Sequence, residues 1–426
     1  MPFDRPGPQG RRKIAVVGGG ISGLGAALAL ADGDDVTLFE AEDRLGGHAR
    51  TVFAGKNIDI PIDTGFIVYN DRNYPNLKAL FQMLDVPTKP SDMSFAATFD
   101  NGRLEYGLRG ARALFAQKRN LVRPAYYAMV RDILRFNRNA HLALDRPELT
   151  LGDFLDELRL GKPFRDWYVL PFSGAIWSAT PQEMLSFPAA SFVQFFQNHG
   201  LLAARGQPAW RTVDGGSRAY VQRLETALRQ KGVTIRLGAS AEAVIPGERP
   251  QLAAAGEAPE PFDAVILASH ADQSLKLLSS TDAEQRRILG ALRYKSNHAV
   301  LHDDPRLMPK RRACWSSWNY IGAGDRSAIG VTYWMNRLQT LPTPDQYFVT
   351  LNPPVDIPDE RIVDTYDFAH PQFDQAAIDA QATLPGIQGR GGVYFAGAYA
   401  KYGFHEDGLR SGLEAARMLG ATPVWA

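Results

Sequence analysis

The chain has 426 residues, of which 45% are hydrophobic and 22% charged, so its composition excludes a disordered or fibrous protein. Its length favours two lobes over a single core. The 47 Lys and Arg residues nearly balance the 46 Asp and Glu residues, which argues against a nucleic-acid-binding field across the whole molecule. The single cysteine, Cys314, excludes an intrachain disulfide and zinc sites built on several thiolates.

Two features bear on where the protein works. No apolar run approaches the roughly 18–20 residues that span a bilayer, and a single cysteine fits a reducing compartment. We therefore expect a cytoplasmic protein. The first 13 residues, which are basic and rich in Pro and Gly, are expected to form a loose arm.

The first strong pattern is a strand, a glycine-rich turn and a helix. Residues 13–17 form a β-type run, glycines follow at Gly18, Gly20 and Gly23, and residues 26–31 are typical of a helix. A second predicted strand, residues 36–39, ends at Glu40, 22 positions beyond Gly18. This spacing predicts a dinucleotide-binding unit in which Gly18 permits the tight turn, Gly20 lets a pyrophosphate approach and Gly23 allows close packing. The helix N-terminus would bind the phosphates and Glu40 the adenosine ribose; a glycine-rich turn without a ligand is the alternative.

The remaining sequence alternates between βα-patterned segments and segments of different composition. Residues 85–208 are helical, aromatic-rich and Arg-rich in character, and residues 272–385 form a mixed region. Predicted strands at 233–237, 263–268 and 392–396, with helices that end near Arg229 and Leu419, return to the βα pattern. We therefore predict a discontinuous nucleotide-binding domain made of residues 1–84, 209–271 and 386–426. A second, substrate-binding domain would comprise residues 85–208 and 272–385.

Further motifs indicate which dinucleotide cofactor is bound. Glu40 is followed by Arg44-Leu-Gly46-Gly47-His48, and Val393-Tyr-Phe-Ala-Gly397 precedes Gly403-Phe-His-Glu-Asp-Gly408-Leu-Arg-Ser-Gly412. With Asp63-Thr64-Gly65-Phe66, these segments resemble motifs of FAD-dependent amine oxidases, phytoene desaturases and protoporphyrinogen oxidases. The resemblance implies an α/β fold with a discontinuous Rossmann-type FAD-binding domain and an inserted α+β substrate domain. It also implies that the last helix points its N-terminus at the flavin, where N–H groups would stabilise negative charge.

The cofactor-binding residues that this resemblance implies lie in these motifs, together with one residue of the middle segment. They are Gly18, Gly20, Ile21, Ser22, Gly23, Glu40, Ala41, Arg44, Gly46, Gly47, His48, Thr64, Gly65, Phe66, Val244, Gly397, Ala398, Asp407, Gly408 and Leu409. Because Cys314 lies outside the C-terminal segment where some amine oxidases tether their flavin, we expect non-covalent FAD. A covalent link through His48 or His405 is the alternative.

The chain departs from the family pattern at two positions. His48 stands where Arg is common, so Arg44 or Arg50 would have to supply the missing guanidinium. Ala398 stands where an acid usually holds the ribitol, so ribitol binding would rely more on backbone groups.

A narrower resemblance bears on the substrate. Residues 62–70, 297–304, 332–339 and 403–412 resemble a bacterial branch of flavoproteins associated with cyclopropane-type fatty-acyl methyltransferases. This implies a desaturase-type oxidation of a hydrophobic, fatty-acyl substrate, with hydride transfer to flavin N5. No second dinucleotide-binding unit is evident, so we expect the substrate to reduce the flavin and dioxygen or a quinone-like acceptor to reoxidise it. A flavin amine or amino-acid oxidase, a redox-neutral flavin isomerase or mutase, and a flavin-binding protein without turnover are the alternatives.

Three residues are candidates for the chemistry. Lys295 lies where amine oxidases carry a lysine bridged by water to flavin N5, although an exposed strand lysine is the competing interpretation. His405 lies beside the predicted flavin edge and could shuttle a proton near neutral pH, or make a structural hydrogen bond. Tyr399, with Tyr402 and Phe404, could shape an apolar substrate slot, or simply pack. The many aromatic residues of both inserted regions favour a large apolar substrate over a small polar one.

A basic cluster lies between Arg109 and Arg138. Eight Lys and Arg residues occur there against the single acid Asp132, with apolar residues such as Leu121 and Leu134 interleaved. The pattern predicts a basic amphipathic surface that docks on anionic lipid at the inner face of the membrane. A solvated helix pair that covers the substrate lobe is the alternative. We expect a hydrophobic small molecule or acyl lipid as the partner, and no nucleic acid.

Overall fold

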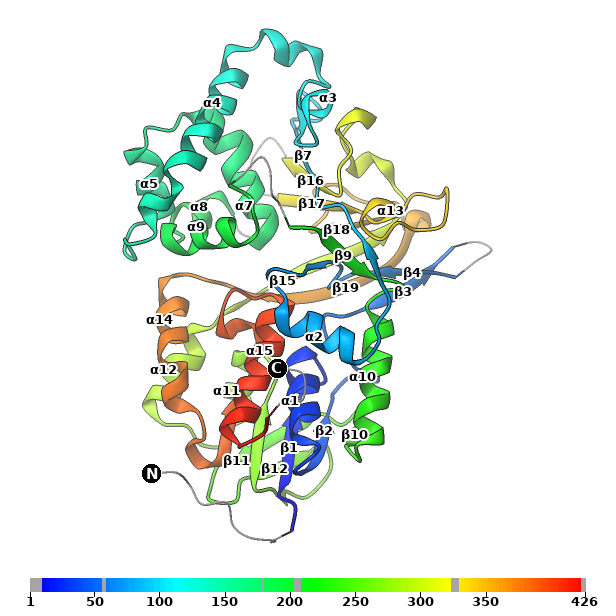
Figure 1. Cartoon of the computed structure of the whole chain (residues 1–426), viewed down its shortest axis with the longest axis vertical. Coiled ribbons are helices and arrows are strands. Elements are labelled where there is room, and N and C mark those ends of the chain that lie inside the picture. Colours follow the sequence, from blue (N-terminus) through cyan, green and yellow to red (C-terminus); the bar gives the residue numbers. More distant parts are fainter. Residues whose placement is uncertain (1–9, 56–58, 178–179, 203–207, 323–328, 423–426) are drawn as a thin grey trace.

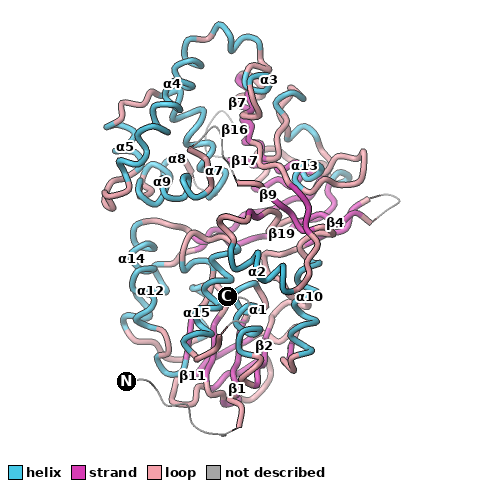
Figure 2. The backbone as a smooth tube through the Cα atoms, viewed as in Figure 1, coloured by secondary structure: helices cyan, strands magenta, loops and turns pink. Residues whose placement is uncertain are grey.

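The computed structural model describes residues 10–55, 59–177, 180–202, 208–322 and 329–422, so most of the predicted N-terminal arm lies outside the described residues. A lower lobe is built around a parallel sheet, and an upper lobe around a mixed sheet and a helical cap (Figure 1). The cap is almost entirely helical, whereas strands dominate the middle of the molecule (Figure 2).

The lower lobe is built on a five-stranded parallel sheet. Its strands are, in order, β10 (Thr234–Arg236), β2 (Asp35–Phe39), β1 (Lys13–Val17), β14 (Ala264–Leu267) and β20 (Val393–Phe395). Ile14 and Val16 point to one face and Ala15 and Val17 to the other, because successive side chains of a strand alternate. Three distant parts of the chain thus form one sheet, and the fold is a discontinuous Rossmann-type domain.

Both faces of this sheet are covered. One core, with Ile14 and Val16, contains side chains from α1 (Ile21–Leu30), α2 (Pro75–Met83), α10 (Arg218–Gln230) and α15 (His405–Met418). The other, with Ala15 and Val17, contains side chains from the small sheet of β11 (Ala241–Ile245), β12 (Gln251–Ala254) and β13 (Glu260–Pro261), and from α11 (Ala271–Leu277), α12 (Ala283–Ala291) and α14 (Gln375–Thr383). These last three helices lie within, or nearly within, segments that we assigned to the substrate-binding domain, yet they pack on the lower lobe. The domain boundaries themselves stay a prediction.

The upper lobe contains a seven-stranded sheet. Its strands are, in order, β19 (Ile362–Pro371), β15 (Tyr294–His302), β18 (Phe348–Leu351), β17 (Ile329–Trp334), β16 (Trp318–Gly322), β7 (Phe95–Phe99) and β8 (Leu104–Gly107). Neighbours are antiparallel except β16 and β7. Short strands join the lobes: β3 (Thr51–Ala54) pairs with β4 (Ile60–Asp63), and β9 (Trp210–Val213) pairs with β5 (Tyr69–Asn70) and β6 (Thr88–Pro90).

The cap follows β8 in the chain. Its helices are α3 (Ala111–Leu114), α4 (Pro124–Asn139), α5 (Leu151–Glu157), α6 (Lys162–Phe164), α7 (Leu170–Trp177), α8 (Pro181–Leu185) and α9 (Ala189–Asn198), and α13 (Met335–Leu338) lies on the sheet side. The prediction that residues 85–208 are helical is wrong for its first part, where β6, β7 and β8 are strands. β7 pairs with β16, a partner so distant in the chain that local sequence cannot reveal it. Within the described ranges, no helix is long and apolar enough to cross a membrane.

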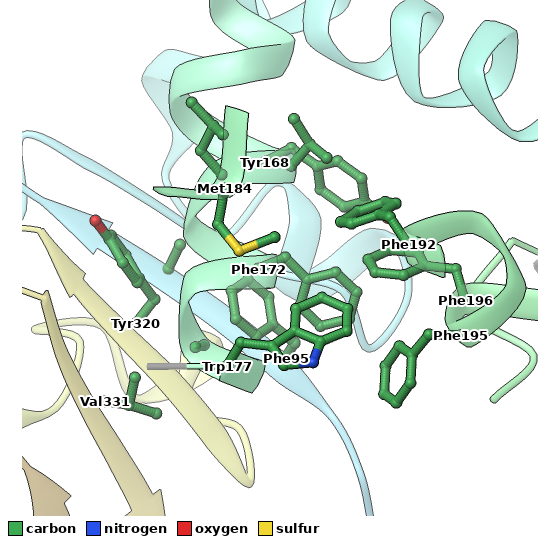
Figure 3. Close-up of a cluster of buried hydrophobic side chains, with 14 of the residues drawn as sticks. Phe95, Tyr168, Phe172, Trp177, Met184, Phe192, Phe195, Phe196, Tyr320 and Val331 are labelled. Atoms are coloured by element: carbon green, nitrogen blue, oxygen red, sulfur yellow. The ribbon is translucent and has the colours of Figure 1, made fainter. Parts of the chain in front are cut away.

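The cap and the mixed sheet enclose one apolar core, which we call the aromatic core (Figure 3). Rings from α7, α9 and β7 dominate it. The rings of Phe192 and Phe196 stack with centroids 4.2 Å apart, and the ring centroids of Trp177 and Phe195 lie 4.7 Å apart. Phe95 brings the sheet into contact with Phe172, at 4.6 Å between centroids.

Candidate functional site

The glycine turn between β1 and α1 has the geometry of a phosphate cradle. Gly18 has φ +110°, and a Cβ there would lie 2.7 Å from the Ala268 carbonyl oxygen. A Cβ at Gly23 would lie 1.9 Å from the Gly18 carbonyl oxygen, so helix and turn touch backbone to backbone. A Cβ at Gly20, by contrast, would meet no atom within 4 Å. The turn is therefore closed on the protein side and open in front of the α1 N-terminus, where the first N–H groups have no intrahelical acceptor.

Glu40 ends β2 beside this turn. Its carboxylate accepts hydrogen bonds from Gly19 N at 2.6 Å and Glu42 N at 2.8 Å. Ala239 N donates to the Glu40 carbonyl oxygen at 2.8 Å, which brings the segment after β10 to the same edge. The Val244 side chain is fully buried in the core of Ala15, Val17 and Phe39, and its carbonyl accepts from Ser279 N. Ala239, which we did not predict, contacts Glu40 directly.

The C-terminal motif meets the glycine turn. α15 crosses α1 so closely that a Cβ at Gly412 would lie 2.0 Å from the Ser22 carbonyl oxygen. At Gly408 a Cβ would lie 3.0 Å from both Ile21 Cγ2 and Ser22 Oγ. The N-termini of the two helices therefore lie side by side, and their partial positive charges act on one region.

Local contacts fix the start of α15. The Asp407 carboxylate accepts from Phe404 N at 3.0 Å and Tyr402 N at 3.3 Å, and Ser411 Oγ accepts from Gly397 N at 2.9 Å. Ala398 follows in a short turn, and Leu409 is fully buried against α1, where its Cδ1 would obstruct a Cβ at Gly25. The predicted C-terminal residues are thus brought to the same end of the sheet as the glycine turn.

The segment from Arg44 to Arg50 lies along the turn. Gly46 N donates to the Gly19 carbonyl oxygen at 2.8 Å, and Ala41, which precedes this segment, is exposed. Both arginines proposed to substitute for a guanidinium at position 48 are already engaged. Arg44 contacts Glu42 at 2.9 Å and the Gly47 carbonyl oxygen at 3.1 Å, and Arg50 forms an ion pair with Asp364 at 2.5 Å.

His48 lies under the face of the β15–β19 pair that looks toward the lower lobe. Its ring centroid is 5.0 Å from that of Phe368, 5.6 Å from that of His370 and 6.1 Å from that of His270. All three imidazoles remain partly exposed although protein surrounds them, as expected for side chains that line a concave site. Burial, reinforced by the neighbouring imidazoles, lowers the pKa of His48 to about 3, and burial lowers that of His370 to about 4. These rings are therefore uncharged at neutral pH.

The Asp63–Phe66 motif completes this wall. Phe66 N donates to the His48 carbonyl oxygen at 2.8 Å, and a Cβ at Gly65 would lie 2.1 Å from that oxygen. Thr64 Oγ1 accepts from Arg50 at 3.3 Å. The Phe66 ring stacks on His405, with centroids 3.9 Å apart and planes 10° from parallel. Segments around positions 48, 65 and 405 thus form one continuous surface.

Asp63 itself joins the two lobes. Its buried carboxylate accepts from Thr51 Oγ1 at 2.6 Å, from Ser217 N and Oγ at 2.8 Å, and from Gln339 Nε2 at 2.9 Å. Burial raises the pKa of Asp63 to about 6, although these hydrogen bonds oppose the shift. The residue is a structural junction beside the site.

The three candidate catalytic residues occupy different settings. His405 Nε2 lies 2.6 Å from the Tyr220 hydroxyl, and burial lowers the pKa of His405 to about 3. Lys295 lies opposite His370 in the β15–β19 pair, and its ammonium is 3.5 Å from the Glu183 carboxylate of α8. Tyr399 is buried in the core of Ala15 and Val17, which fits the packing interpretation better than a place in a substrate slot.

Sequence reasoning missed several residues of this surface. His270 and His370 flank His48 but come from positions more than 200 residues away. Phe404, which leads into α15, stacks on Phe195 of the aromatic core at 5.0 Å. The sequence motif had already suggested Phe404 as part of an apolar slot beside the flavin edge, whereas its contact with Phe195 on α9 could not be predicted from the sequence.

Comparisons with known proteins agree with this geometry. Residues 21–301, about two thirds of the chain, match the family described as flavin containing amine oxidoreductase. An FAD-dependent oxidoreductase of Emericella nidulans, dbaF, is 38% identical over 102 residues, which are 22% of this chain and 21% of that protein. The chain thus matches about a fifth of the length of such curated relatives.

Solved structures extend the likeness to nearly the whole chain. A CLA-producing fatty acid isomerase from P. acnes has a TM-score of 0.68 at 15% identity, over 96% of this chain and 98% of its own. Cyclohexylamine oxidase from Brevibacterium oxydans has a TM-score of 0.67 at 17% identity, over 96% and 99%. These likenesses show the two-domain fold, and the match over residues 21–301 shows that the chain belongs to the flavin-containing amine oxidoreductase family.

Proposed function

We propose that this protein binds FAD non-covalently and oxidises a hydrophobic, fatty-acyl-type substrate. A flavin cofactor follows from the family, and when bound it supplies the hydride-accepting chemistry. The single observation that carries the substrate class is the contact of Phe404, beside the predicted flavin edge, with the aromatic core of the cap.

The residues around the two helix N-termini fit an adenine dinucleotide. The open space at Gly20 lies in front of unpaired N–H groups, as a pyrophosphate requires, and the Glu40 carboxylate stands at the β2 edge for a ribose. Gly408 and Asp407, at the start of α15, would hold the flavin end. Non-covalent binding is supported by the burial of Cys314 away from this region.

The carboxylates beside the site already accept hydrogen bonds from protein groups. This disfavours a substrate with an ammonium group, which would need such a carboxylate as its partner. Asp63 accepts from three neighbouring side chains, Glu406 accepts from Asn76 N and Leu77 N at 2.9 Å, and Asp407 caps the α15 start. Burial also raises the pKa values of Glu406 and Asp407, which weakens them further as partners for a cation. An apolar substrate needs no such partner.

His405 is our candidate for holding a proton during the reaction. Burial raises the pKa of Tyr220 well above its usual value, so its hydroxyl stays protonated beside His405 Nε2. In the tautomer that carries its proton on Nδ1, Nε2 accepts from the Tyr220 hydroxyl and Nδ1 can donate to a bound group. Lys295 keeps a cation on the β15 side of the site, held by Glu183. His48 and His370, whose imidazoles are uncharged at neutral pH, add no positive charge to the same wall.

Anaerobic mixing tests the proposal. The purified protein should be yellow and should release free FAD when denatured. A free fatty acid or an acyl phospholipid should bleach the visible flavin band without dioxygen, whereas primary amines and NADPH should not. Bleaching by an amine instead would favour an amine oxidase. Conversion of a fatty acid to a positional isomer only after external reduction of the flavin, with no bleaching by the substrate, would favour a redox-neutral isomerase.

A further inference from the structure

A surface of the cap lies remote from the flavin site. The single turn Lys118–Val122 and the first residue after it connect α3 to α4 at the upper end of the molecule (Figure 1). We call Lys118, Arg119, Leu121, Val122 and Arg123 the tip. The tip combines aliphatic and cationic side chains on a single loop.

The aliphatic side chains of the tip are exposed. Val122 keeps 81% of its surface accessible and Leu121 keeps 50%. The outer face of α4 continues this pattern with Tyr127 and Leu134, at 47% and 63%. The inner face of α4 already contributes to the aromatic core, through Tyr126, Met129 and Phe136. Folding of the cap therefore does not account for these exposed apolar residues.

Cations surround them without intramolecular partners. Lys118, Arg123, Arg135 and Arg138 form no ion pair with any residue in the described part of the chain. Asp132, the one acid of this stretch, is fully buried and accepts from Gly161 N at 2.9 Å as well as pairing with Arg131. The exposed positions 127, 131, 134 and 138 recur at helical spacing, so one face of α4 is both basic and apolar.

A basic pocket adjoins the tip. Arg103, Arg119, Lys310 and Arg311 line it, with Asp100 as the carboxylate at its rim. Glu105 is fully buried beside it, pairs with the Arg311 guanidinium and accepts from the Lys310 backbone N at 2.6 Å. With Arg311 balanced by Glu105, the side chains of Arg103, Arg119 and Lys310 outnumber Asp100 in the lining, and this excess of positive charge suits a phosphate group.

We propose that the tip docks on an anionic phospholipid bilayer. Leu121 and Val122 enter the boundary between headgroups and acyl chains, and the unpaired cations of the tip and α4 contact lipid phosphates. Two copies of so basic a surface would repel each other, which excludes a homodimer through the tip. Surfaces that bind single-stranded nucleic acid stack bases mainly on aromatic rings, whereas the most exposed apolar side chain here is Val122. This inference does not depend on the reaction proposed above.

Vesicle co-sedimentation of the full flavin-loaded chain tests the proposal. We expect binding to vesicles of phosphatidylcholine mixed with phosphatidylglycerol, much weaker binding to phosphatidylcholine alone, and loss of binding at high salt. No pelleting with anionic vesicles, or equal pelleting with both compositions, would overturn it. Binding to a single-stranded oligonucleotide without binding to vesicles would overturn it in favour of a nucleic-acid surface.

Matched variants separate the two contributions. Lys118→Gln/Arg119→Gln/Arg123→Gln should lower the partition coefficient about 100-fold, because each basic residue near an anionic surface contributes roughly 1 kcal/mol. Leu121→Ser/Val122→Ser should also weaken binding, and this loss should persist at low salt. The controls, on the lower lobe and on an exposed loop, are Lys276→Gln/Arg286→Gln/Arg287→Gln and Val355→Ser. Equal losses in the controls would refute the assignment to the tip, and unchanged circular dichroism and flavin absorbance would show that the tip variants fold.

Discussion

Gly20 offers the sharpest test of the cofactor site. In Gly20→Ala the new methyl group would meet no protein atom within 4 Å, and the backbone at φ −75°, ψ 178° is open to any residue. Alanine lowers the entropy of the unfolded chain, which stabilises by about 0.4–1 kcal/mol, whereas the loss of glycine at a helix N-cap costs a similar few tenths or more. The free energy of unfolding of the flavin-free protein should therefore change by less than about 1 kcal/mol.

The same methyl group should weaken FAD binding. It fills the space in front of the α1 N-terminus, so a pyrophosphate could no longer approach the free N–H groups. Losing a single hydrogen bond to a charged group costs about 1.5–3 kcal/mol, which corresponds to a Kd about 10- to 150-fold higher. Titration of flavin-free protein with FAD, followed by flavin fluorescence, measures this Kd.

Gly33→Ala is the matched control, because a Cβ at Gly33 also meets nothing within 4 Å but lies at the other end of α1. We expect its Kd to equal that of the parent, and its unfolding free energy to rise by about 0.4–1 kcal/mol because alanine lowers the entropy of the unfolded chain. A Gly20→Ala protein that binds FAD as tightly as the parent would show that the open space is not the phosphate site. A strongly destabilised Gly20→Ala protein would show that the turn itself is misplaced.

Three further predictions use other contacts. Gly412→Ala should lower the urea midpoint and reduce the free energy of unfolding by about 1–3 kcal/mol, because the new methyl group forces α15 away from the Ser22 carbonyl. Gly386→Ala, where a Cβ meets no atom within 4 Å, should not lower the urea midpoint. Glu40→Ala should raise the Kd for FAD, measured by equilibrium dialysis, because it removes the carboxylate that holds Gly19 N. Asp43→Ala is the control, because Asp43 is exposed and forms no ion pair within the described residues, and it should leave the Kd unchanged. Equal effects of the two substitutions would reject the ribose role of Glu40. Burial lowers the pKa of His405 from 6.5 to about 3, so the unfolded chain binds more protons than the folded one between those pH values, and stability should fall as the pH drops through that window. The free energy of unfolding of the flavin-free parent should therefore fall by about 1–2 kcal/mol more between pH 7 and pH 5 than that of His405→Gln. An identical pH dependence of the two proteins would contradict a buried, neutral ring.

The sequence predicted the lower lobe well because its signals are local. The run at 13–17 forms β1 with the predicted bounds, and the strands at 36–39, 263–268 and 392–396 match β2, β14 and β20 to within one residue at each end. The glycine spacing fixed the turn, since the close contacts of Gly18 and Gly23 admit no larger residue. The convergence of Gly20 and Gly408, predicted only from two motifs, is confirmed by the α1–α15 contact.

The upper lobe was harder to predict from the sequence, for physical reasons. β15 and β19 pair over nine positions, from Tyr294 with Pro371 to His302 with Ile362, and no local pattern specifies such a long-range register. The cluster of His48, His270 and His370 could not be predicted for the same reason, because the three residues come from segments that meet only in the folded chain. The competing interpretation of Lys295 as a strand residue agrees with its position in β15, but its partner Glu183 lies on a cap helix whose orientation the sequence could not predict.

The crossing of α15 over α1 constrains when this protein can acquire its cofactor during synthesis. The glycine turn leaves the ribosome long before β20 and α15, which complete the sheet edge and the second helix terminus. A nascent chain therefore exposes a half-built cradle while the residues between them are made. Flavin loading must wait for α15, and a chain that ends before His405 would yield a colourless product however well its first strands fold.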